Sequence, residues 1–260
     1  DILGVARSYN NLGSLGWRLG SWDDALENFK RSAELQVRLG DAEGIIILNI
    51  NLGLLQIDRG YTDEARNYLE DALFRAEQIG HNFHIAQTNH HMSVLLNTLG
   101  EWNTALEYDL RSKALLESLG EKATLGDVFV NMGSIYLGLK DLVNATRYGE
   151  QALNEFSVDD ETEVKGCALR LLGDIALGRQ DFETAKKLYR QAEAIFEAGG
   201  NQLERGRLLM SLARLAKLQS NQMLTKSCLT LAQKTFEQLG ARMDLHKLDV
   251  LKKELAAQRK

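Results

Sequence analysis

Four of the five histidines fall in one stretch of eleven residues, at positions 81, 84, 90 and 91. Imidazole nitrogens bind Zn²⁺, and two histidines three or four residues apart on a helix can hold the same ion. Only His81 and His84 have that spacing, no cysteine is near, and the nearest acidic residue along the chain is Glu77. We therefore predict no metal site, and we assign the cluster to surface and groove polarity, with His91 as a hydrogen-bonding contact.

Paired carboxylates are the second candidate for chemistry. Asp23 and Asp24, and the acidic run at 159–161, stand where turns are expected, and there carboxylates cap helices and favour the positive end of the helix dipole. The sequence contains no GxSxG, no GxxxxGK[ST], no HExxH and no GxGxxG. We therefore predict no enzymatic activity and no cofactor.

Small residues recur every 40 positions and indicate an internal repeat. Glycine stands at 40, 80, 120, 200 and 240, with Asp160 in the remaining place. Two further columns are Gly13, Gly53, Ser93, Gly133, Gly173 and Ala213, and Ala25, Ala65, Ala105, Ala145, Ala185 and Thr225. Apolar residues within each unit follow helical spacing, so each unit is predicted to be two helices that turn near Gly20 or its equivalent. One such hairpin cannot bury its apolar face alone, but stacked hairpins can.

The first unit carries residues at a spacing typical of a known family: Leu12, Gly13, Gly20, Trp22, Ala25 and Phe29. The unit from 11 to 35 thus resembles a tetratricopeptide repeat, and all six units match to some degree. The match is weaker in the third unit, where Asp109 replaces an aromatic residue, and in the sixth, where Gln222 and Thr225 replace the aromatic residue and the alanine. The proline that usually precedes each new unit is missing.

This resemblance implies an all-α fold, a right-handed α-solenoid of six helix-turn-helix repeats with a C-terminal capping helix. The implied repeats are about 5–40, 41–80, 81–120, 121–160, 161–200 and 201–240, with the capping helix at 241–260 in one solenoid domain. Units of 40 residues resemble those of kinesin light chain, of Leu-Gly-Asn-repeat adaptors and of MalT-like STAND sensor arms.

Composition limits the partners and the compartment. Lys and Arg number 31 against 36 Asp and Glu, so the net charge of −5 has the wrong sign for a nucleic-acid binder. No stretch approaches the roughly 18 apolar residues of a membrane span.

Cys167 and Cys228 have neither disulfide-framework nor zinc spacing, which predicts reduced thiols and a cytoplasmic protein. The chain begins with Asp1 and shows no signal peptide, so we interpret it as a piece of a longer polypeptide.

The family resemblance also implies an inner groove. In related proteins an asparagine two residues before the small column binds the backbone of an extended peptide, and here Asn11, Asn51 and Asn131 hold that position while His91 departs from it. Residues on the same helical arc are predicted to line the groove as well. They are apolar in the middle units (Ile47, Ile50, Leu54, Val94 and Val130) and basic in the last two (Arg170, Arg207 and Arg214).

We therefore predict a protein-interaction scaffold whose groove takes an extended or helical peptide segment, with an acidic group of the peptide at the arginines. Two alternatives stay open. The apolar helix near Ile47 could instead pack against an N-terminal domain or a second copy of the chain, since exposed apolar patches mark interfaces of either kind. The solenoid could also be the sensor arm of a multidomain ATPase, cyclase or transcription regulator, binding a small inducer such as a sugar.

Overall fold

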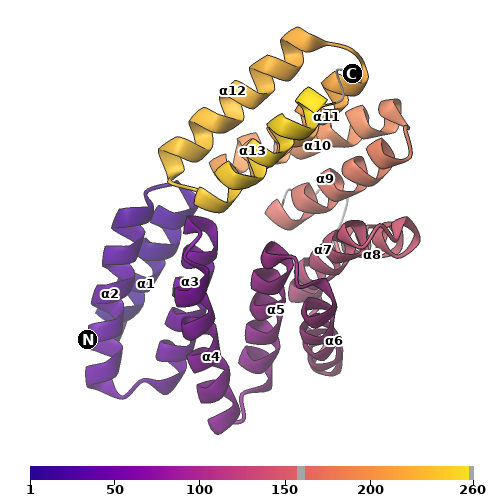
Figure 1. Ribbon diagram of the computed structural model, residues 1–260. Coiled ribbons are helices and arrows are strands. Elements are labelled where there is room, and N and C mark those ends of the chain that lie inside the picture. The colour runs from indigo at the N-terminus through magenta and orange to yellow at the C-terminus, as the bar shows by residue number, and fades with distance from the viewer. Residues whose placement is uncertain (157–161, 258–260) are drawn as a thin grey trace.

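The computed structural model describes residues 1–156 and 162–257. The acidic run at 159–161, including Asp160 of the glycine column, and the last three residues of the predicted capping segment lie outside this part. The described residues form thirteen helices and no strand, so the predicted all-α fold is confirmed (Figure 1). Within this part of the chain, no helix has the length and apolarity that crossing a bilayer requires.

The helices are arranged as six hairpins followed by one more helix. The first helices of the hairpins are α1 (Ile2–Arg18), α3 (Ala42–Arg59), α5 (Asn82–Leu99), α7 (Lys122–Gly138), α9 (Glu163–Gly178) and α11 (Gln202–Leu218). The second helices are α2 (Trp22–Leu39), α4 (Thr62–Gln78), α6 (Trp102–Leu119), α8 (Leu142–Asn154), α10 (Phe182–Gly199) and α12 (Gln222–Leu239). The chain ends with α13 (Arg242–Ala257). Each hairpin packs mainly within itself and then on its neighbours, as in a solenoid.

The small-residue columns lie where helices approach most closely. A Cβ atom added to Gly13 would lie 2.5 Å from the ring of Phe29, and one added to Gly173 would overlap the ring of Tyr189. Ala105, which belongs to the column that begins with Ala25, is completely buried. Larger side chains at these positions would push the two helices of a hairpin apart, which explains why the columns stay small.

The turn inside each hairpin keeps one conformation even where glycine is absent. Gly20 adopts a left-handed φ of 85°, and Lys140, Gln180 and Ser220 hold the equivalent place with φ of 63°, 63° and 59°. A side chain in this region costs about 1–2 kcal/mol. Packing of the hairpin therefore dictates the turn. Asp141 and Asp181 follow it as N-caps whose side chains accept backbone hydrogen bonds.

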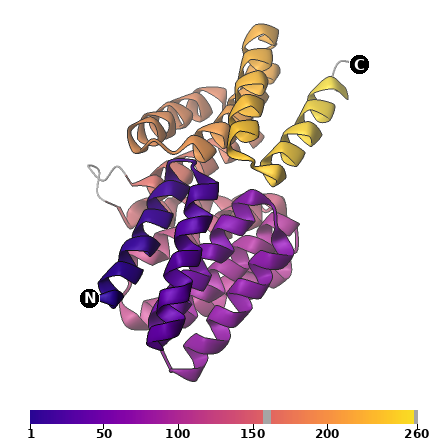
Figure 2. The same ribbon diagram turned by 90° about the vertical axis from the view of Figure 1, so that its left-hand side faces the viewer.

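The two ends of the solenoid meet. Helix α13 contacts both α3 and α11, and the turn between α12 and α13 lies beside the ends of α1 and α3 (Figures 1 and 2). A Cβ atom added to Gly20 would lie 2.6 Å from the side chain of Leu239, and one added to Gly60 would lie 3.0 Å from that of Arg242. Residues from both ends, among them Leu52 and Leu248, belong to one hydrophobic cluster. The C-terminal helix therefore closes the solenoid and does more than cap it.

This closure explains why α3 is apolar on nearly every side. The helix is in contact with α1, α2, α4, α5 and α13. Its large apolar residues that are at most 5% exposed are Ile46, Leu48, Ile50, Leu52, Leu55 and Ile57. The sequence left open that an N-terminal domain or a second copy covers this helix, and the same chain supplies much of the cover. Self-association through α3 stays a prediction.

Candidate binding channel

Two adjoining cavities lie along the inner face of the closed solenoid. The first has a volume of about 430 Å³ and extends toward α13, and the second has a volume of about 400 Å³ and extends toward α1. Both are lined by Ile57, Asp58, Val94 and Arg207, so they meet at these residues. We call the two together the inner channel.

Half of the predicted groove residues lie along this channel. They are Leu54, His91, Val94, Arg170, Arg207 and Arg214. Their helices α3, α5, α9 and α11 are the first helices of their hairpins, so the predicted arc and the concave face of the solenoid coincide at these positions.

The other predicted groove residues do not line the channel. Ile50 is only 5% exposed and packs in the core with Ala72 and Ala76 of α4. Asn51 donates its side-chain hydrogen bond to Asn10 at 3.0 Å. The remaining residues outside the channel lining are exposed Asn11 and half-buried Ile47 and Val130.

Asn131 differs most clearly from what we expected. It is 8% exposed, and its Nδ2 donates to Ser93 Oγ at 2.9 Å and to Asp109 Oδ2 at 2.8 Å. Its Oδ1 accepts a hydrogen bond from Asn97 at 2.9 Å, so this amide is committed to the fold and not free for a peptide backbone. The cause is Asp109, which replaces the usual aromatic residue and, being completely buried, needs polar partners.

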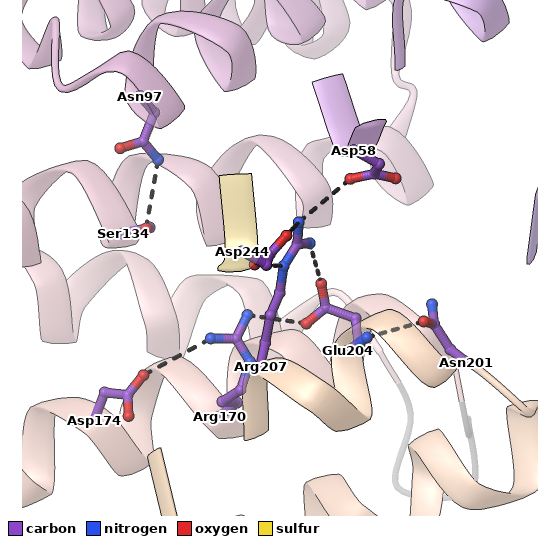
Figure 3. Close-up of polar contacts among 9 residues, drawn as sticks. All are labelled: Asp58, Asn97, Ser134, Arg170, Asp174, Asn201, Glu204, Arg207 and Asp244. Atoms are coloured by element: carbon purple, nitrogen blue, oxygen red, sulfur yellow. Dashed lines mark hydrogen bonds and ion pairs between the residues drawn. The ribbon is translucent and has the colours of Figure 1, made fainter. Parts of the chain in front are cut away.

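Arg207 of α11 is the centre of a cluster of buried charges (Figure 3). Its guanidinium group donates to Asp244 at 2.9 and 3.0 Å, to Glu204 at 2.6 Å and to Asp58 at 3.3 Å. These three carboxylate side chains are 2%, 8% and 13% exposed. Trp17 also donates its indole N–H to Asp58 at 2.9 Å. One arginine therefore joins α3, α11 and α13, which bring the two ends of the solenoid together.

The predicted groove arginines are consequently less available to bind a ligand than the sequence suggested. Arg170 pairs with Glu204 at 3.0 Å and lies 3.8 Å from Asp174. Arg214 forms no ion pair with any residue that the structure describes. We expected a basic end of the groove, but only Arg214 of the three predicted arginines keeps a guanidinium group without a carboxylate partner.

The second cavity carries an excess of negative charge. Its lining includes four carboxylates against two guanidinium groups, namely Asp58, Asp127, Glu163 and Glu204 against Arg18 and Arg207. Burial raises the pKa of Asp58 to about 6 despite the opposing charge of Arg207, and burial likewise raises the pKa of Asp127 to about 6. Burial would also raise the pKa of Glu204, but Arg170 and Arg207 together lower it to about 2.

Two histidines line the same cavity. The ring Nδ1 of His90 is hydrogen-bonded to Asp109 at 2.9 Å, and this contact raises the pKa of His90 although burial opposes the charged form. Burial and the neighbouring His90 hold the pKa of His91 well below its usual value. The Nδ1 atom of His91 is buried without a hydrogen-bond partner among the described residues, so a neutral imidazole offers a polar atom there.

The sequence did not identify Asp58, Glu204 and Asp244 as channel residues. Asp58 and Arg207 are separated by 149 residues, and no spacing rule connects them. A weak signal existed in the sequence, because Asp58 lies on the face of α3 from which we selected the predicted groove residues. This arrangement of charged, polar and apolar side chains around a channel is suited to binding a ligand with both polar and apolar groups.

Residues 4–78, which include the first two hairpins, match the tetratricopeptide repeat family model. Among solved structures, a Rap protein complexed with Competence and Sporulation Factor is similar at a TM-score of 0.71 and 16% identity, over 96% of this chain and 75% of that chain. The apo form of RapI gives 0.67 and 15% identity, over 97% of both chains. A STAND protein with a tetratricopeptide repeat sensor from Pyrococcus horikoshii gives 0.62 and 16% identity, over 94% of this chain and 37% of that chain.

No curated protein matches the sequence. The family match at the N-terminal hairpins and the shared fold across the chain confirm the resemblance to tetratricopeptide repeat proteins. This fold is a general scaffold for protein interactions.

Proposed function

We propose that the chain binds a short peptide segment of a partner in the inner channel. The observation that carries this proposal is the pair of adjoining cavities along the first helices of the hairpins, where polar and apolar side chains alternate. Closure by α13 favours a short segment over a long helix, because the two ends of the solenoid already contact each other. We infer a binding module and not an enzyme.

Charge sets the orientation of the proposed peptide. A cationic side chain or a free amino terminus would lie in the second cavity, near Asp58 and Asp127, because an opposite charge offsets the cost of burying those carboxylates. A carboxylate of the peptide would lie in the first cavity, at Arg214, whose guanidinium group can bind a carboxylate in a bidentate manner. Leu54 and Val94 would contact apolar side chains between the two.

The comparisons support a peptide ligand. A Rap protein of the same fold was crystallised with Competence and Sporulation Factor, and the similarity covers 96% of this chain. At 16% identity this likeness concerns the fold, so the ligand of the present chain is inferred from its own channel.

A small inducer is the second candidate. Cavities of about 400 and 430 Å³ fall in the range of roughly 300–1,000 Å³ that is usual for small-molecule sites. The indole of Trp17 lines the second cavity and could stack on a sugar ring, but its N–H is already bonded to Asp58. A cytoplasmic location stays a prediction from the two free cysteines.

The proposal is tested by selecting binders from a library of random hexapeptides with free termini, followed by calorimetry on the enriched sequences. We expect enriched peptides to carry Lys, Arg or a free amino terminus at one end. Asp127→Asn and Arg214→Gln should each weaken binding by about tenfold, corresponding to about 1.4 kcal/mol for one charged hydrogen bond.

Lys226→Gln is the matched control, because Lys226 is an exposed residue of α12 outside the channel. Equal affinities in all three variants would refute the channel as the peptide site. Enrichment of no peptide, together with binding of a sugar that Asp127→Asn abolishes, would favour the small inducer.

A further inference from the structure

A second group of residues lies away from the inner channel, where the N-terminal ends of α3 and α5 come together. It consists of Glu43 in the first turn of α3, His81 at the N-cap of α5 and His84 in the first turn of α5. One ligand atom from each residue lies within 4.8 Å of the others. The side chains of Glu43 and His81 are 56% and 39% exposed, so solvent reaches the group, whereas that of His84 is only 6% exposed.

The hydrogen-bond partners of His84 are suited to an imidazole that binds a metal ion. Its Nδ1 lies 3.1 Å from Gln87 Oε1, and its Nε2 lies 3.3 Å from Glu43 Oε1. Both neighbours are acceptors, and a neutral imidazole has a single N–H to donate, so either a second proton or a metal ion on Nε2 is needed. A metal ion between Nε2 and the Glu43 carboxylate resolves this, because Nδ1–H then donates to Gln87 while the Nε2 lone pair binds the metal. A histidine ligand held by an oxygen on its other ring nitrogen is the usual arrangement at zinc sites.

One of the distances already has the value expected at a zinc site. Zn²⁺ binds nitrogen and carboxylate oxygen at about 2.0–2.2 Å, so two tetrahedral ligand atoms are about 3.3–3.5 Å apart. His84 Nε2 and Glu43 Oε1 meet that value at 3.3 Å, whereas His81 Nε2 lies 3.9 Å from the same oxygen. The His81 ring is stacked on that of His84 with 4.1 Å between the ring centroids, so the half-exposed His81 side chain must turn to bind the same ion. His81 Nδ1 now accepts a long 3.4 Å hydrogen bond from the His84 amide. Binding through Nε2 would move the His81 proton to Nδ1 and release this bond.

We propose that Glu43, His81 and His84 bind a zinc ion, with a water molecule at the fourth position. Two histidines and one glutamate are an established ligand set for Zn²⁺ with an open coordination position. The sequence argued against a metal because Glu77 was the nearest acidic residue along the chain, whereas the stacking of hairpins brings Glu43 to His84 from 41 residues away. The ion links the second and third hairpins and is independent of the peptide channel.

The test uses the full chain without a histidine tag, freed of metal with a chelator and titrated with Zn²⁺ by calorimetry. We expect one ion per chain and no binding of Mg²⁺, which prefers oxygen ligands. Glu43→Gln should reduce the zinc affinity at least tenfold. Glu64→Gln is the matched control, since Glu64 is an exposed glutamate in the first turn of α4 and its substitution changes the net charge equally.

Gln87→Leu should lower the affinity about tenfold to a hundredfold, since it removes the oxygen that orients His84. His84 is buried, so the helicity of His84→Gln is first compared with that of the wild type, and Glu43→Gln serves if His84→Gln fails to fold. Substitution with Co²⁺ should give the visible absorption of a tetrahedral site in the wild type and in Glu64→Gln, but not in Glu43→Gln. Zinc binding of equal strength in the wild type and in Glu43→Gln would overturn the proposal and leave a simple ion pair between Glu43 and His84.

Discussion

The guanidinium group of Arg207 is the most informative group to remove. Arg207→Met keeps much of the side-chain volume but deletes the cation that Asp58, Glu204 and Asp244 share. These carboxylates are at most 13% exposed, so water in the channel replaces the lost partner only in part, although Glu204 keeps its ion pair with Arg170. Removing one partner of a buried ion pair costs about 3–5 kcal/mol of unfolding free energy, and we expect a loss in this range at pH 8.

The loss should depend on pH with a defined sign. Without Arg207 the pKa of Asp58 rises beyond its present value of about 6, because burial remains and the opposing charge is gone. The folded variant then binds more protons than the unfolded chain, so its stability falls as pH rises. The loss of unfolding free energy in Arg207→Met, relative to the wild type, should therefore be at least about 1 kcal/mol smaller at pH 5.5 than at pH 8.

Equilibrium unfolding in urea at both pH values measures this difference. Arg205→Met is the matched control, since Arg205 lies on the same helix and pairs with Glu197 at 3.1 Å, with side chains 37% and 55% exposed. A surface pair of this kind contributes about 0–1 kcal/mol. If Arg207→Met were as stable as Arg205→Met at pH 8, the buried cluster would not be what holds the two ends of the solenoid together.

Three further changes test the packing and the electrostatics. Gly173→Ala should cost about 1–3 kcal/mol in thermal unfolding, because the new methyl group meets the Tyr189 ring, whereas Gly178→Ala, which has open space, should be neutral or stabilising by up to about 1 kcal/mol. Ala105→Phe should likewise cost about 1–3 kcal/mol, and an unchanged melting temperature would mean that the hairpin is not tightly packed there. The unfolding free energy in urea should decrease between pH 5 and pH 7.5, and Asp127→Asn should make this decrease smaller by about 1 kcal/mol, because the folded-state pKa of Asp127, about 6, lies above its ordinary value of 3.8. The remaining decrease comes from Asp58, and an identical decrease in both proteins would contradict the assigned burial of Asp127.

The periodic columns were sufficient to predict the fold. Gly13 and Ala105 are small because a helix lies against them, and this relation holds within one hairpin, where the sequence separation is short and repeated. The helical spacing of apolar residues and the glycines at the turns are likewise local patterns, and they predicted the α-helices and the turn positions.

The candidate site was less predictable, because its contacts join different hairpins. The family resemblance assigned Asn131 to ligand binding, but the replacement at Asp109 supplies a buried acceptor that takes this amide. Arg207 lies along the channel as expected, yet its partner Asp58 comes from α3, which approaches α11 only where the solenoid closes. A pattern read along the sequence shows which face a residue occupies and not which charge lies opposite.

The closure of the solenoid also fixes the number of its repeats. In an open array each unit contacts only its neighbours, so units can be duplicated or lost at little cost. Here an inserted hairpin would carry α13 away from α3 and separate Arg207 from Asp58, so that Asp58 would lose its cation. Growth by duplication is therefore penalised in this chain, and its descendants can diversify by substitution along the channel far more readily than by a change of length.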